Sequence, residues 1–225
     1  MTQLVYGTLG YDAAHMLGGL MLLLSFTLLS QRRMTALIDI YALQATCLAL
    51  AAFWQGHVQS APALYLTGAI AFAAKAVLIP AALRRLMLRL QLTETMEPAL
   101  GIFASMALGV GLVVLSIMVV LPVTMQSQAL TREDLALALS VVLLGLLMMI
   151  SRRSAFAQVI GFMSLENGLI LAAIGVAGMP LVVELSLAVL ILVAFVVFGA
   201  FLRRMDRQFH SLDTTNLDRV GGQHR

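Results

Sequence analysis

Cysteine and charge are both scarce in this 225-residue sequence. Cys47 is the only cysteine, which excludes an internal disulfide, a thiolate-bound cluster and a CxxC zinc site within this chain. Only 11% of the residues are charged, 61% are hydrophobic and the mean hydropathy is +0.97, values outside the range of soluble domains. The scarcity of charge therefore excludes a soluble fold and indicates an integral membrane protein.

Motifs for nucleotide binding and catalysis are also missing. The chain has no GxGxxG, Walker loop, catalytic triad or metal-ligand cluster, so we expect it to bind no cofactor or metal and not to be catalytic alone. The net charge of +3 does not indicate nucleic acid, because the basic residues lie at the ends of apolar runs. No Lys or Arg precedes the first apolar run, so we expect that helix to be retained rather than cleaved as a signal.

Long apolar runs dominate what the sequence does contain. They extend over about 18 to 24 residues, the length that an α-helix needs to cross roughly 30 Å of hydrocarbon, and they lack the period of two of a β-barrel. The sequence therefore predicts an all-α membrane protein in the lipid bilayer. Its seven transmembrane helices are expected at 13–30, 35–55, 62–83, 98–121, 134–151, 154–177 and 181–202.

Every second connection between these spans is rich in basic residues. Arginines gather at 31–33, 84–89, 152–153 and from 203 onward, whereas the other connections offer only Arg132. The positive-inside rule then predicts an amino terminus outside and a carboxyl terminus in the cytoplasm, for a multi-pass protein of a bacterial or archaeal cytoplasmic (inner) membrane. The same pattern of basic connections suggests a division of the chain into a four-helix part (1–125), a three-helix part (126–205) and a polar cytoplasmic tail (206–225).

Ionisable residues inside the spans are the candidate functional residues. A charge at the centre of a membrane helix costs roughly 3 kcal/mol, so Lys75, Glu166 and Glu184 are expected to be paired, neutralised or facing water. Glu166 lies midway along its span, beside Asn167, and Lys75 lies at a similar depth. A direct ion pair is one arrangement that this shared depth allows, and the two residues would serve either to fix helix registry or to relay protons.

The sixth span predicts two opposite faces. Small residues recur along one face, with Gly161, Gly168 and Gly175 every seven positions, which is typical of close helix packing. The other face is expected to hold the carboxylate together with Gln158 and Phe162. In the third span, Pro80 follows Lys75 and is expected either to bend the helix and open a hydrated gap or to form a static kink.

Two further residues are predicted to have supporting roles. Asp39 lies near the cytoplasmic face, where it is expected to snorkel or to neighbour Arg32 and Arg33. His15 is interpreted as a proton group or as half of a haem ligand pair, for which His57 is the other candidate. Asn167 and Gln158 complete the supporting set.

The segment 151–204 contains SLENG, then a turn with MP, then VEL. This arrangement resembles component E of the hydrogenase-4 and formate hydrogenlyase-type membrane complexes. In that family the last three helices are similar to the K subunit (chain 4L) of respiratory complex I and to the C subunit of multisubunit cation/proton antiporters. Lys75 and Pro80 also resemble the family pattern, so the resemblance covers about residues 10–205.

The resemblance implies a membrane-arm subunit without a redox centre, within a complex I-like oxidoreductase assembly of the hydrogenase type. It implies antiporter-like membrane subunits and a complex I-like membrane anchor subunit as partners, with nickel-iron and iron-sulfur centres in partner subunits. Glu166, Lys75 and Glu184 are implied as proton-relay residues.

The sequence departs from the family pattern at two places. The K subunit has its glutamate nearer the cytoplasmic arginine pair than Glu166 is, and ELSLAVLILVAF lacks an aspartate that is frequent farther into the last helix. Two alternatives remain open: a purely structural scaffold subunit, and a subunit of a cation/proton antiporter without hydrogenase.

Overall fold

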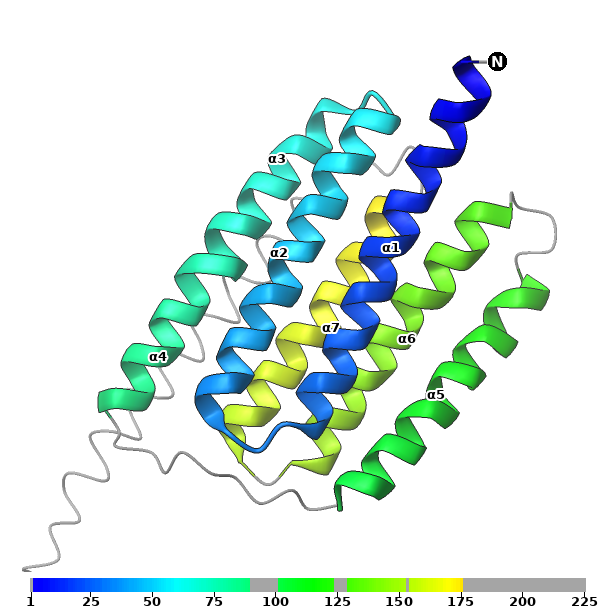
Figure 1. Cartoon of the computed structure of the whole chain (residues 1–225). Helices are drawn as coiled ribbons and strands as arrows, with labels where there is room; N and C mark the ends of the chain where they lie inside the picture. Colours follow the sequence, from blue (N-terminus) through cyan, green and yellow to red (C-terminus); the bar gives the residue numbers. More distant parts are fainter. Residues whose placement is uncertain (1, 90–100, 124–128, 153, 176–225) are drawn as a thin grey trace, which may run out of the picture. The chain divides into compact units, whose positions relative to one another are not determined.

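A computed structural model describes residues 2–89, 101–123, 129–152 and 154–175 (Figure 1). Contacts group the chain into a unit Met1–Met179 and a unit Pro180–Arg225, and all described residues belong to the first. Its elements are α1 (Thr2–Ser30), α2 (Met34–Val58), α3 (Pro62–Ile70), the π-helix η1 (Ala71–Leu78), α4 (Ile79–Arg89), α5 (Ile102–Val123), α6 (Ala129–Ser151) and α7 (Ala155–Gly175).

Within these described ranges, six helical segments are long and apolar enough to cross a membrane. They are Ala13–Ser30, Met34–Val58, Pro62–Leu88, Ile102–Pro122, Asp134–Ser151 and Phe156–Gly175. The prediction of an all-helical membrane protein is confirmed, and six of the predicted spans coincide with these segments. The predicted span at 181–202, Glu184 within it and the tail at 206–225 lie outside the described residues. The predicted division of the chain near residue 125 stays a prediction.

The third span is continuous but not uniformly α-helical. It begins at Pro62, changes to a π-helix over Ala71–Leu78, and returns to an α-helix at Ile79. The amide of Ile79 donates to the carbonyl of Ala74, which is the wider bonding pattern of a π-helix. Pro80 follows directly and has no N–H to donate. The structure thus shows a wide helical segment that holds Lys75 and ends just before Pro80, and a hydrated gap or a static kink at this proline stays a prediction.

Glycines let α6 and α7 approach each other closely. A Cβ on Gly145 of α6 would lie 2.6 Å from the amide nitrogen of Leu165, and one on Gly168 of α7 would lie 2.8 Å from that of Val142. Gly161 faces the carbonyl of Gly145 in the same interface. The small-residue face predicted for the sixth span is therefore confirmed, and its neighbour is α6.

The connections also hold the helix ends together. Arg152, between α6 and α7, donates to the carbonyls of Leu29 and Gln31 at 2.7 and 2.6 Å and so satisfies acceptors that the end of α1 leaves open. At the other end of the helices, Gln59 Nε2 donates to the carbonyl of Ile174 at 3.0 Å. The bundle is thus tied at both ends by side chains that bond to backbone carbonyls.

Candidate functional site

A buried ion pair lies between η1 and α7. Lys75 Nζ is 3.1 Å from Glu166 Oε2, with side chains that are 2% and 9% exposed respectively. The wide turn of η1 carries the lysine, and the fourth turn of α7 carries the glutamate. Of the arrangements that the sequence allowed for these two residues, the structure shows the direct ion pair.

A chain of hydrogen bonds extends from this pair through the bundle. Lys75 Nζ donates to Asn167 Oδ1 at 3.0 Å, and Asn167 Nδ2 donates to Gln44 Oε1 at 3.3 Å. Gln44 Nε2 donates in turn to Ser25 Oγ at 2.8 Å, and Ser25 Oγ donates to the carbonyl of Met21 at 2.9 Å. The chain joins η1, α7, α2 and α1, and its side chains are all buried.

The direction of these bonds is the same from one end to the other. Each amide accepts at its oxygen and donates at its nitrogen, and the backbone carbonyl of Met21 can only accept. Asn167 is thereby held with its oxygen toward Lys75, where it stabilises an ammonium group. Among the side chains of this hydrogen-bonded series, only Lys75 and Glu166 ionise. They are therefore the two groups of the series that can exchange a proton.

Two members of the carboxylate face predicted for the sixth span differ from Glu166 in exposure. Gln158 and Phe162 are exposed, and Gln158 Nε2 donates to the carbonyl of Arg152 at 2.9 Å. A step of four residues turns an α-helix by about 40° beyond a full turn, so Gln158 points roughly 80° away from Glu166. Only the Glu166 end of the face meets η1.

Asp39 lies near the helix ends as predicted, but its partner is different. It forms an ion pair with Arg84 of α4 rather than with the predicted Arg32 or Arg33, because α2 packs against α4 and η1 on that side. Both side chains are more than half exposed, so this pair adds little to stability.

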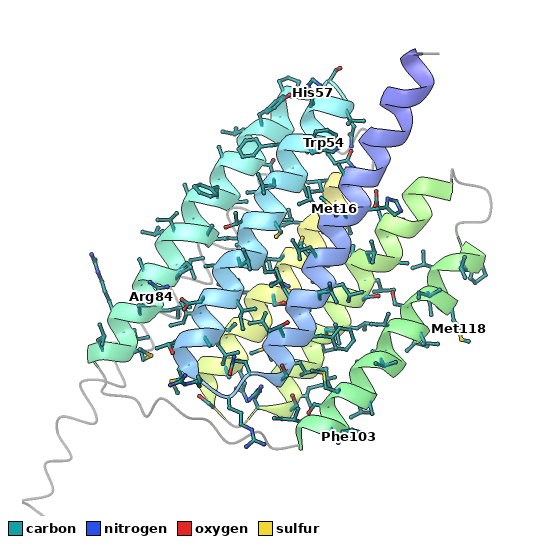
Figure 2. All side chains as sticks on the ribbon, in the orientation of Figure 1. Met16, Trp54, His57, Arg84, Phe103 and Met118 are labelled. Carbon is teal, nitrogen blue, oxygen red and sulfur yellow. The ribbon has the colours of Figure 1, made fainter. Side chains whose placement is uncertain are left out.

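His15 is paired with a carboxylate and not with a second histidine. Its Nδ1 lies 3.4 Å from Asp134 Oδ1, which joins α1 to α6. His57 is exposed near the end of α2, close to Trp54 (Figure 2). His15 and His57 thus contact different residues, and both interpretations of His15, as a proton group and as half of a haem ligand pair, stay predictions.

Sequence reasoning missed Gln44, Ser25 and Arg152. Gln44 is a lone amide in an otherwise apolar part of its span, and that isolation was the available signal, because an amide inside a membrane helix needs a partner. Ser25 gives no such signal, since a serine can bond to its own helix. Arg152 was read only as a topology marker.

The helices and this polar centre define a polytopic membrane protein with a buried lysine–glutamate pair. The chain is 31% identical over 209 residues to hydrogenase-4 component E of Escherichia coli (strain K12), which covers 92% of this chain and 96% of that protein. The same values hold for hydrogenase-4 component E of Shigella flexneri. The chain therefore belongs to the hydrogenase-4 component E family.

A third relative comes from Mycobacterium tuberculosis. An uncharacterized protein of Mycobacterium tuberculosis is 29% identical over 202 residues, which cover 89% of this chain and 91% of that protein. No family model and no solved structure matches the chain. The predicted likeness of the last three helices to the complex I K subunit stays a prediction.

Proposed function

We propose that this chain is a membrane subunit of a hydrogenase-4-type, complex I-like assembly, that it holds no redox centre, and that Glu166 and Lys75 take part in proton translocation. The observation that carries the proposal is the 3.1 Å contact of Lys75 Nζ with Glu166 Oε2 inside a spanning bundle. Ionisable side chains at such a depth are expensive and mark proton or ion pathways. The family supplies the kind of complex.

The proton shared by the pair can reside on Lys75 or on Glu166. When the N–H bond of the lysine ammonium breaks and an O–H bond forms at Glu166 Oε2, both residues become neutral, and the reverse step restores the ion pair. In a medium of low dielectric constant these two states are closer in free energy than in water. A charge moving in a neighbouring subunit would shift the balance and push a proton onward.

The orientation proposed for the chain is amino terminus outside, with a seventh span at 181–202 that returns the carboxyl terminus to the cytoplasm. Its support is that Arg152 and the end of α1 bond to each other, while Arg84 lies away from the end that holds His57 (Figure 2). Basic residues at one end favour the cytoplasm. Glu184 would then lie near the outer mouth of the route.

Partner subunits are proposed to be antiporter-like membrane proteins and a complex I-like anchor. The support is the exposed apolar side of α5, where Phe103 and Met118 are 89% and 66% exposed. Such a surface needs lipid or another helix against it. Nickel-iron and iron-sulfur centres would be supplied by other subunits.

A purely structural scaffold is the second candidate, and one observation favours it. Lys75 has two acceptors, Glu166 and Asn167, and the amide chain beyond them joins several helices. Buried polar groups of this kind can fix helix registry without moving protons. The two candidates differ in what happens when both charges are removed together.

The test compares Glu166→Gln, Lys75→Met and the double variant in the native complex. Each single variant leaves one buried charge without its partner, whereas the double variant leaves none, so assembly should suffer least in the double variant. Proton uptake by vesicles is measured per electron transferred. A relay predicts that the double variant assembles but translocates fewer protons, and a scaffold predicts that both assembly and proton uptake recover.

Asp39→Asn is the matched control, because it removes an exposed carboxylate outside the proposed route. It should change neither assembly nor proton uptake. Chains that co-purify with the protein separate the remaining alternative, since an antiporter without a nickel-iron or iron-sulfur subunit would contradict the hydrogenase assignment.

A further inference from the structure

Two buried oxygens beside the ion pair have no hydrogen-bond partner among the described residues. They are Glu166 Oε1 and Tyr41 Oη. Tyr41 is completely buried and Glu166 is 7% exposed. A buried polar atom left without a partner costs about 1 to 3 kcal/mol, and in native proteins such atoms commonly mark the place of an internal water or ion.

The two residues lie at neighbouring levels of the contact between α2 and α7. These helices pack together and run in the same direction (Figure 1), and the bond from Asn167 to Gln44 fixes their register. Tyr41 lies on the Gln44 face of α2, about 4.5 Å earlier along the axis, and Glu166 lies about 1.5 Å before Asn167. Along the helix axes the two residues are therefore separated by only about 3 Å.

The remaining groups of the site are already engaged. Lys75 binds Glu166 Oε2 and Asn167 Oδ1, and both ends of the Asn167 amide are bonded. Oε1 of Glu166 is therefore the oxygen of the pair that is available for a further ligand. That ligand must donate to a carboxylate and also bond to a phenol, and a water molecule does both.

We propose that Tyr41 Oη and Glu166 Oε1 bind a water molecule through which Glu166 gains and loses its proton. This inference rests on the proposed function and extends it to the cytoplasmic side of Glu166. When the water carries an excess proton as H₃O⁺, one of its O–H bonds breaks as an O–H bond forms at Oε1. Water and a neutral carboxylic acid remain. Tyr41 keeps its own proton and acts as a positioning residue that orients the water.

Removing the Tyr41 hydroxyl is the test, with Tyr41→Phe in the native complex. The phenyl ring keeps the packing, so the complex should still assemble, and its thermal stability should fall only slightly because one water-mediated hydrogen bond is lost. With one polar partner fewer, the water is held poorly. Proton uptake per electron should fall several-fold. Tyr65→Phe is the matched control, because Tyr65 is 43% exposed on α3, and proton uptake should stay unchanged.

Infrared difference spectra of the same complexes give a second measurement. A water band that shifts in H₂¹⁸O and responds to turnover should be present in the native complex and in Tyr65→Phe, and absent from Tyr41→Phe. Unchanged proton uptake in Tyr41→Phe, loss of assembly, or a protein side chain bonded to both oxygens would each overturn the inference. If Glu166→Gln lowers proton uptake and Tyr41→Phe does not, the water site fails while the proposed function stands.

Discussion

Gln44 of α2 and Asn167 of α7 share a buried hydrogen bond of 3.3 Å, in which Asn167 Nδ2 donates to Gln44 Oε1. The bond fixes which end of the Asn167 side chain faces Lys75, since the amide oxygen remains for the lysine at 3.0 Å. A neutral residue on α2 therefore sets the surroundings of an ionisable residue on η1.

Gln44→Leu should destabilise the bundle and loosen the ion pair. The change removes the acceptor of Asn167 and the donor to Ser25, and interhelical hydrogen bonds in membranes contribute about 0.6 to 1.7 kcal/mol. We expect the free energy of unfolding in mixed micelles to fall by about 1 to 2 kcal/mol. Thr46→Val is the control, because the Thr46 hydroxyl donates to the carbonyl of Ala42 in its own helix; an equal loss there would contradict the prediction.

Gly145→Ala should disrupt the contact of α6 with α7. The added Cβ would lie 2.6 Å from the amide nitrogen of Leu165, and a backbone atom cannot move aside as a side chain does. We expect a loss of about 1 to 3 kcal/mol. Gly111→Ala on α5 is the comparison, since no atom of the described residues lies within 4 Å of an added Cβ and alanine favours a helix by up to about 1 kcal/mol. Similar melting temperatures for the two variants would refute the packing role.

Arg152→Lys should open the end of α1. Arg152 Nη2 donates to the carbonyls of Leu29 and Gln31, and a lysine cannot reproduce the planar guanidinium. Burial, followed by the charge of Arg32, lowers the pKa of the Arg152 guanidinium, but arginine stays protonated and the bonds remain charge-assisted. We expect faster amide hydrogen exchange around residues 28–33. Arg85→Lys, an exposed change on α4, should leave that exchange unaltered.

Ser60→Gly should be neutral or slightly stabilising, and Ser60→Val destabilising. Ser60 has φ 52° in the turn between α2 and α3, a left-handed conformation that glycine adopts freely and that a β-branched residue adopts only with strain. The strain of the valine variant should amount to about 1 to 3 kcal/mol. Thermal unfolding of the two variants side by side checks the sign, and a valine variant as stable as the glycine variant would contradict it.

Depth in the membrane was predictable from the sequence, and it identified the central pair. Hydropathy located the spans, the position along each span placed Lys75 and Glu166 at a similar level, and the cost of isolated charges left pairing, neutralisation or contact with water as the options. The structure brings them to 3.1 Å. The glycine face of α7 was predictable for a similar reason, because only small residues allow backbones to approach closely.

Rotation about the helix axes was not predictable from the sequence. Gln158 and Glu166 share an approximate face on paper, yet one is exposed and the other buried, because the neighbouring helices cover only part of that face. The partner of Asp39 depended on which helix lies beside α2. Gln44 and Ser25 meet across 19 residues of sequence, and no local pattern reports a contact between two helices.

The π-helix of the third span changes which residues share a face before and after it. One helical wheel therefore does not describe both halves of the span. Each widened turn contains an extra residue, so the positions before Ala71 and those after Leu78 are out of phase with a regular α-helix. Deleting one residue from this segment would convert a π-helical turn into an α-helical turn and rotate the Lys75 amine away from Glu166. The helix on either side would remain intact. The extra backbone of the π-helix thus sets the direction of the Lys75 side chain. The length of the segment 71–78 matters as much as the identity of the residue at 75.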